Sequence, residues 1–112
     1  MAKQRKKILL VDDDQDLLDL YRQILGRMPS NPEILVANNG ARALAILEEE
    51  VLPEMLICDL RMPKMDGLQL LVIVRRKFPQ LRTVVLTSLP DEEFRSRSYS
   101  MGVDLFWQKP AN

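Results

Sequence analysis

Apolar residues along the chain form two alternating patterns, short unbroken runs and longer segments with helical spacing. The runs hold too few residues for helices, which is typical of strands buried on both faces of a sheet. The short runs predict strands at 8–11, 33–37, 55–59, 82–87 and 105–107. Apolar positions three and four residues apart predict helices at 16–28, 41–51, 68–78 and 91–101.

Strands that alternate with helices along the whole chain imply right-handed crossovers and a parallel sheet covered on both faces. The chain has 112 residues and is 46% apolar, enough to bury one core. We therefore expect a doubly wound α/β fold with a single domain over 1–112. The basic residues within 1–6 are interpreted as a solvated tail rather than a docking site.

The charge balance narrows the range of partners. Sixteen Lys and Arg residues offset sixteen Asp and Glu residues, so the domain itself is not expected to bind nucleic acid or a membrane. No segment approaches the length of a membrane span, and no secretory signal precedes the first strand. The single cysteine, Cys58, lies within an apolar run and is expected to be a buried packing residue. A reducing, cytoplasmic location is expected.

Polar side chains that could bind a metal or react stand at the C-terminal ends of four of the predicted strands. Asp12 and Asp13 follow the first strand, and Asp59 ends the third. Thr87 ends the fourth strand, and Lys109 follows the fifth. The C-terminal ends of parallel strands share one edge of a sheet, so these side chains are expected to converge there.

A cluster of three carboxylates requires a cation. Two carboxylates about 5 Å apart repel by roughly 3 kcal/mol at an effective dielectric constant of about 20. The donors are oxygen atoms and the chain has no histidine, which favours Mg²⁺ before Ca²⁺. A carboxylate beside Mg²⁺ is a competent nucleophile toward phosphorus and would give an aspartyl phosphate. The metal and a nearby ammonium group would neutralise charge on the transferred phosphoryl group, and the Thr87 hydroxyl could hydrogen-bond it.

Four motifs together resemble the CheY-like receiver domains of response regulators in two-component signalling. They are ILLVDD at 8–13, DLRMPKMDG at 59–67, LTS at 86–88 and FWQKP at 106–110. Each motif is weak alone, but their order and spacing match over about residues 6–110. The resemblance implies a flavodoxin-like sheet with strand order 2-1-3-4-5.

The resemblance also implies a role for each site residue. Asp59 would take a phosphoryl group from a histidine kinase or phosphotransfer protein. Asp12, Asp13, Asp59 and the backbone carbonyl of Arg61 would bind Mg²⁺, and Lys109 would contact the phosphoryl group. Such a domain signals by changing conformation to control a partner or effector. It is not an enzyme, because it assists only its own phosphorylation and dephosphorylation.

Further implications concern the switch between conformations. Thr87 would move toward the phosphoryl group, and Phe106 would swing inward to fill the space that Thr87 leaves. The peptide before Pro110 would be cis. Because 12–14 are three consecutive aspartates, the assignment of the metal pair rests on the resemblance. Asp14 could instead be a ligand or the N-cap of the following helix.

Two departures from the family pattern are informative. The family's fifth helix is absent after residue 110, which would leave Leu105 and Trp107 without cover. We expect either that the natural protein continues or that a partner supplies this layer. The 68–78 helix is also unusually apolar, and Val72 and Ile73 are predicted to lie off its sheet-facing side. They indicate an interface, for a homodimer or an effector domain, unless Val72 is merely an isolated exposed valine.

Other functions were weighed against the receiver interpretation. A phosphatase of the haloacid-dehalogenase type needs an acid/base aspartate where Arg61 stands, and the four glycines are too scattered for a phosphate-binding loop. The main alternative is a receiver-like protein-interaction scaffold that is never phosphorylated. Neither Arg61 nor Leu89, at the accessory positions beside Asp59 and Thr87, can orient an attacking water. A phosphoryl group on Asp59 is therefore expected to persist.

Overall fold

The computed structural model describes residues 6–49, 52–59, 67–87, 95–96, 99–100 and 102–108. Strands and helices alternate as the sequence predicts. Their bounds are β1 (Lys7–Val11), α1 (Gln15–Gly26), β2 (Glu33–Ala37), α2 (Gly40–Leu47), β3 (Met55–Asp59), α3 (Gly67–Lys77), β4 (Arg82–Thr87) and β5 (Leu105–Gln108).

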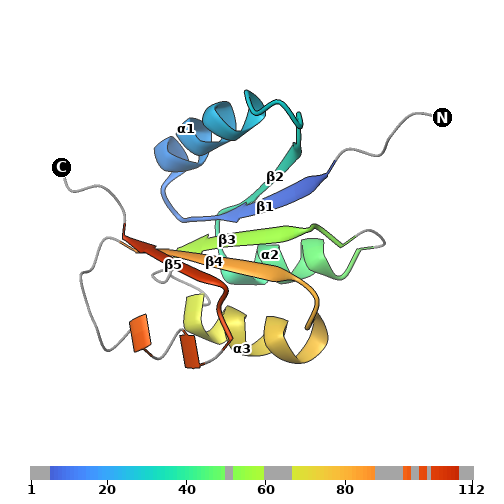
Figure 1. Ribbon diagram of the computed structural model, residues 1–112, viewed down its shortest axis with the longest axis vertical. Coiled ribbons are helices and arrows are strands. Elements are labelled where there is room, and N and C mark those ends of the chain that lie inside the picture. Colours follow the sequence, from blue (N-terminus) through green and yellow to red (C-terminus); the bar gives the residue numbers. More distant parts are fainter. Residues whose placement is uncertain are drawn as a thin grey trace.

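All five strands are parallel and lie in the order β2-β1-β3-β4-β5 (Figure 1). This confirms the predicted strand order. The chain moves to one side of β1 to form β2 and to the other side to form β3, β4 and β5. The strand order therefore reverses next to β1, and ligands of such sheets bind beyond the strand ends at this kind of reversal.

The helices cover the sheet unequally. α1 lies on one face over β1 and β2, and α2 and α3 lie on the other (Figure 1). The larger core lies between the sheet and the α2–α3 layer and includes Leu9, Leu56, Leu70 and Val74. Cys58 belongs to this core as a fully buried side chain outside any disulfide, which confirms its predicted packing role.

The apolar spacing over 16–28 predicts a helix with one broad buried face, and this prediction is wrong for α1. Leu18 is the helix's only buried residue, whereas Leu20 is 48% exposed and Ile24 is 53% exposed. α1 rests on only two strands near the β2 edge of the sheet, so a narrow stripe of the helix meets the core. The helix also ends at Gly26 rather than at Met28, which is itself exposed.

The second helix is shorter than predicted. α2 ends at Leu47, and Glu48 caps it by donating its backbone N–H to the Leu44 carbonyl. The Glu48 carboxylate then pairs with the Lys77 ammonium at 3.1 Å, which joins the C-terminal ends of α2 and α3. Glu48 and Glu49 therefore lie beyond the end of the helix rather than within it.

The segment predicted as the 91–101 helix is described only in part. Residues 95–96 and 99–100 are helical. Gly102 follows with a φ of 89°, and its N–H donates to the Tyr99 carbonyl at 3.0 Å, as expected for a glycine cap. A Cβ at Gly102 would lie 2.6 Å from the Arg75 Nε of α3, so the flexible end of that side chain would have to shift. The positive φ is the stronger reason for glycine at this turn.

The two sides of β5 differ sharply in cover. Phe106 packs against Leu71, Val85 and Val103 on the α3 side. On the opposite side Leu105 is 39% exposed and Trp107 is 60% exposed, because no described helix lies over β4 and β5 there (Figure 1). Trp107 therefore lacks cover from the described part of the chain, as the sequence predicts.

The outer surface of α3 also agrees with its prediction. Leu70, Leu71 and Val74 are fully buried, whereas Val72 is 49% exposed and Ile73 is half-buried. Whether Val72 contributes to an interface is not tested by this arrangement. Within the described ranges, no helix has the length and apolar character needed to cross a bilayer.

Candidate functional site

The candidate site lies where β1, β3, β4 and β5 end. Val11 is paired with Cys58, so Asp12 and Asp59 are the next residues on adjacent strands. Asp59 is in turn paired with Leu86, and Thr87 is the next residue of β4. Because neighbouring strands lie about 4.8 Å apart, the backbones of Asp12 and Asp59 are direct neighbours at this edge.

Asp12 is a buried carboxylate, only 4% exposed. Its backbone N–H donates to the Ala37 carbonyl at 3.1 Å, which fixes the end of β1 against β2. Its Oδ1 accepts the Asp14 N–H at 3.0 Å. A charged group of this kind is costly to bury unless hydrogen bonds or a counter-charge compensate. Asp12 therefore has the features of a binding group rather than of a surface residue.

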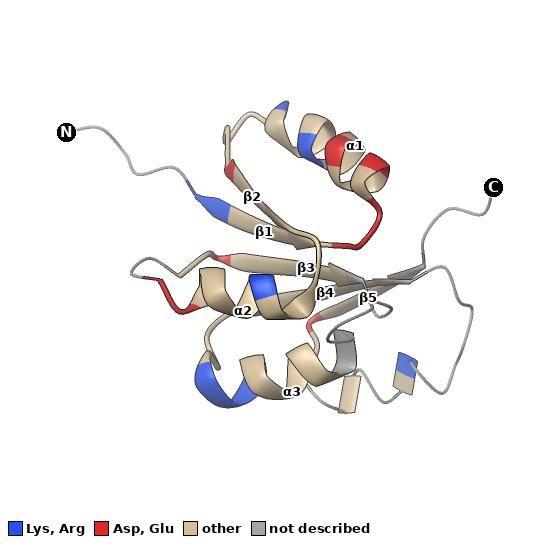
Figure 2. Ribbon diagram, turned by 180° about the vertical axis from the view of Figure 1, so that it is seen from behind, with Lys and Arg blue, Asp and Glu red and all other residues tan. Residues whose placement is uncertain are grey.

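The three consecutive aspartates have separate structural positions. Asp14 is the N-cap of α1, and its Oδ1 accepts the N–H groups of Asp16 at 3.0 Å and Leu17 at 3.3 Å. Asp13 is exposed between the buried Asp12 and this cap. Acidic residues continue from the end of β1 into the first turns of α1 (Figure 2). Capping therefore occupies Asp14, which favours Asp12 and Asp13 as the pair available to a cation.

The remaining predicted residues are placed to different extents. Asp59 and Thr87 are the final residues of β3 and β4. The structure describes their backbones but not their side chains. Thr87 is paired with Gln108, the last described residue of β5, and Lys109 is the next residue in the sequence. Arg61, Leu89 and Lys109, together with Pro110 and its expected cis peptide, lie outside the described residues.

The donors fit a hard divalent cation by their chemistry. Asp12, Asp13 and Asp59 supply only oxygen atoms, and the chain has no histidine. The described side chains alone contain no cluster of three metal-ligating groups, because the predicted set needs the Asp59 carboxylate. Asp12 and Asp13 would be two protein ligands at the rim of the sheet, and several water ligands would complete a Mg²⁺ shell.

Sequence reasoning missed the contact between Tyr99 and Phe106. The Tyr99 hydroxyl accepts the Phe106 N–H at 3.3 Å, and the two ring centroids are 6.4 Å apart. The guanidinium carbon of Arg95 lies 6.0 Å from the centre of the Tyr99 ring. An aromatic residue on each side of a glycine cap was the available signal, but it does not specify which atoms meet.

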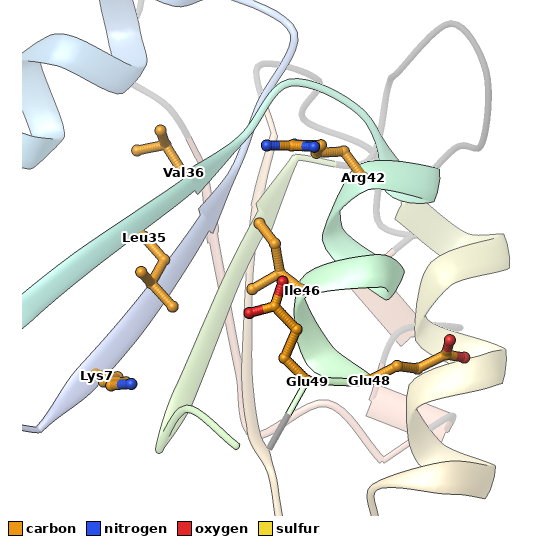
Figure 3. A pocket seen from close by; sticks show the side chains of 7 residues that line it. All are labelled: Lys7, Leu35, Val36, Arg42, Ile46, Glu48 and Glu49. Carbon is orange, nitrogen blue, oxygen red and sulfur yellow. The ribbon is translucent and has the colours of Figure 1, made fainter. Parts of the chain in front are cut away.

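A separate pocket does not coincide with the strand ends. It lies between β2 and α2, has a volume of about 650 Å³, and is drawn in Figure 3. Its lining combines Leu35, Val36 and Ile46 with the oppositely charged side chains of Lys7, Arg42, Glu48 and Glu49. The pocket holds no carboxylate from the strand-end cluster, so it is not part of the candidate site.

Comparisons with known proteins agree with the fold. Residues 8–112 match the response regulator receiver domain family. The chain therefore belongs to that family, whose members are the receiver domains of two-component systems. It is 37% identical over 106 residues to the transcriptional regulatory protein CpxR of Klebsiella pneumoniae, a match that covers 95% of this chain and 44% of CpxR. The chain thus spans less than half the length of that relative.

Two solved structures extend the similarity to receiver domains with bound groups. The phosphorylated cyanobacterial phytochrome response regulator RcpA is 27% identical, with a TM-score of 0.87 over 97% of this chain and 84% of RcpA. The Mn²⁺-bound form of the response regulator Rcp1 is also 27% identical, with a TM-score of 0.88 over 96% of this chain and 83% of Rcp1. A receiver domain of this fold can therefore carry a divalent metal.

Proposed function

We propose that this domain accepts a phosphoryl group on Asp59 from a histidine kinase or phosphotransfer protein and then controls a partner or effector. The observation that carries the proposal is the register of β1 and β3, which makes buried Asp12 the neighbour of Asp59 at the end of the sheet. Membership in the receiver family and the phosphorylated state of the similar protein RcpA support it. We propose a cytoplasmic signalling domain rather than an enzyme.

The proposed reaction transfers a phosphoryl group from the donor's imidazole, the leaving group, to the Asp59 carboxylate, the nucleophile. A carboxylate oxygen of Asp59 forms a bond to phosphorus while the bond from phosphorus to the donor's imidazole nitrogen breaks. Asp12, Asp13, Asp59 and the Arg61 carbonyl would hold Mg²⁺, which when bound neutralises charge on the phosphoryl oxygens. Lys109 would add a second positive charge, and Thr87 would donate its hydroxyl hydrogen to a phosphoryl oxygen.

The proposed switch is a shift between two conformations. The phosphoryl group carries nearly two negative charges in place of the single charge of the Asp59 carboxylate. Only contacts that differ between the two conformations can change their populations. A change from 1:99 to 99:1 requires about 5.5 kcal/mol of preference for the active conformation. Charge-assisted hydrogen bonds from Thr87 and Lys109 could supply much of it. Phe106 would follow Thr87 inward, since it already packs on the α3 side of β5.

Acetyl phosphate with Mg²⁺ tests the acceptor directly. Intact mass spectrometry should detect one added phosphoryl group on the wild-type chain and none on Asp59→Asn. Asp12→Asn should be phosphorylated at least ten-fold more slowly, because it removes a charged donor from the metal site. Asp14→Asn is the matched control, since asparagine also caps helices. It should react at the wild-type rate.

The alternative is a receiver-like interaction scaffold that is never phosphorylated. The exposed apolar side chains of Val72 and Trp107 are the observation that favours it, since exposed apolar surface can mark an interface. Failure of the wild-type chain to gain a phosphoryl group from acetyl phosphate and from a phosphohistidine donor would favour the scaffold. Modification that persists in Asp59→Asn would reject Asp59 as the acceptor.

A further inference from the structure

We propose that Tyr99 is a positioning residue that couples the helical residues 95–96 and 99–100, here called the helical segment, to Phe106. The inference rests on the proposed function, in which Phe106 is the aromatic residue that moves after phosphorylation. It identifies the group through which that movement reaches the surface of the domain. Tyr99 does not contact the strand-end carboxylates in the proposal; it acts through the position of Phe106.

The first observation is the hydrogen bond from β5. The Phe106 N–H donates to the Tyr99 hydroxyl at 3.3 Å. β5 is the last strand of the described sheet and pairs with β4 alone. A side-chain acceptor at this edge therefore connects the strand to the helical segment. Tyr99 is 41% exposed, so water could hydrogen-bond its hydroxyl equally well, and burial does not explain the bond to Phe106.

The second observation is that the same side chain contacts the Phe106 ring. The ring centroids are 6.4 Å apart and the ring planes are inclined by 48°, within the range of favourable aromatic pairs. The Arg95 guanidinium carbon lies 6.0 Å from the Tyr99 ring centre, at the outer limit for a cation–π contact. Tyr99 therefore contacts both the backbone and the ring of Phe106, and it also contacts Arg95 on its own helical segment.

The third observation is that the intervening turn is fixed at several points. Gly102 donates its N–H to the Tyr99 carbonyl at 3.0 Å, and Arg75 of α3 occupies the space beside it. Asp104 and Thr83 form two reciprocal bonds, Asp104 N–H to the Thr83 carbonyl at 3.0 Å and Thr83 N–H to Asp104 Oδ2 at 2.8 Å. These bonds anchor the start of β5 to β4.

An anchored turn leaves the Tyr99 side chain as the route for coupling. Because residues 102–104 are held against α3 and β4, a change in Phe106 is not readily passed through the backbone. Inward movement of Phe106 would instead break its ring contact with Tyr99 and alter the hydrogen bond. The described arrangement contains both contacts, so Tyr99 stabilises the position that Phe106 has in it, partly buried against Leu71, Val85 and Val103.

The variant Tyr99→Phe removes the hydroxyl and retains the ring. Loss of one such hydrogen bond should raise the population of the alternative Phe106 position roughly 2-fold to 10-fold. Trp107 follows Phe106 and is the only tryptophan, so its fluorescence reports on β5. The matched control is Tyr21→Phe, which makes the same change at the other tyrosine, on α1.

Two measurements on the 112-residue chain test the proposal. Without phosphorylation, amide hydrogen exchange at Phe106 should be several-fold faster in Tyr99→Phe than in wild type or Tyr21→Phe. After acetyl phosphate and Mg²⁺, intact mass should show equal modification of all three chains. Before phosphorylation, the Trp107 emission of Tyr99→Phe should already differ from wild type by up to about a tenth of the full response to phosphorylation, because a 2-fold to 10-fold rise from a ratio of 1:99 populates the alternative conformation to about 2–9%.

The outcomes separate the inference from the proposed function. Unchanged Phe106 exchange in Tyr99→Phe, with equal modification of all three chains, would overturn the role of Tyr99. Equal changes in Tyr21→Phe would show a general effect of tyrosine removal and would also overturn it. If no chain were phosphorylated, the proposed function would fail, while faster Phe106 exchange in Tyr99→Phe alone would still support Tyr99 as the residue that positions Phe106.

Discussion

At the scale of single residues, the three aspartates after β1 show how identical side chains acquire different roles. Asp12 is buried at the strand end, Asp13 is exposed, and Asp14 accepts two N–H groups of the first turn of α1. The sequence left open whether Asp14 is a cap or a cation ligand. Backbone geometry decides in favour of the cap, since Asp14 has an extended conformation with its carboxylate over the helix start.

The cap predicts a stability effect that is separate from phosphorylation. Asp14→Ala should lower the free energy of unfolding by about 1 kcal/mol, because the Asp16 and Leu17 N–H groups lose their acceptor. Asp14→Asn should change it by only a few tenths of a kcal/mol. Urea denaturation followed by circular dichroism measures both. Equal stability of Asp14→Ala and wild type would contradict the capping role.

A second residue-scale prediction concerns the lifetime of the phosphoryl group. Neither Arg61 nor Leu89 offers a carboxylate or amide to orient an attacking water, so decay should be slow. Leu89→Glu should accelerate it several-fold by providing such a group. The measurement is loss of the added mass after removal of acetyl phosphate, with Leu89→Met as a control. An unchanged decay rate in Leu89→Glu would count against this explanation.

At the scale of elements, the sequence predicted the strands more accurately than the helix surfaces. Apolar runs such as 55–58 are bounded by proline and charge, so strand positions agree with the structure within one residue. The exposed side of α1 was misjudged because helical spacing reveals apolar residues but not the width of the surface that meets them. The bond between Tyr99 and Phe106 was beyond reach, since it depends on how a helical segment and a strand meet in space.

The turn before β5 gives an element-scale prediction. Gly102→Ala should lower the free energy of unfolding by about 1–2 kcal/mol, because an L-residue at positive φ is strained. The new Cβ would also displace the Arg75 guanidinium, which lies within 3 Å of it. Gly26→Ala is the matched control, since a Cβ there meets nothing within 4 Å. It should be neutral or slightly stabilising in the helix. Similar urea midpoints for both variants would contradict the strain argument.

At the scale of the whole molecule, the strand-end site and the uncovered sheet face have different origins in the sequence. The site residues could be predicted because parallel strands bring their C-terminal ends to one edge, wherever those residues lie in the chain. The open face could be predicted because Leu105 and Trp107 alternate with Phe106 and must point away from α3. The identity of the layer that covers Leu105 and Trp107 cannot be predicted from these two residues. We propose downstream chain or a partner for this role.

The exposed face around Trp107 predicts that the cost of replacing this residue depends on whether a covering layer is present. In the 112-residue chain, Trp107→Ser should change the free energy of unfolding by less than about 0.5 kcal/mol, since the indole is mostly solvated. When a covering layer is present, the same substitution should cost about 1–2 kcal/mol, because burial of the exposed indole area then contributes to stability. Urea denaturation of the 112-residue chain, first alone and then with the covering layer present, compares the two costs of the substitution. Ser100→Ala, at an exposed position outside this face, should have the same small effect in both contexts. A large cost of Trp107→Ser in the 112-residue chain would show that its own residues already bury the indole.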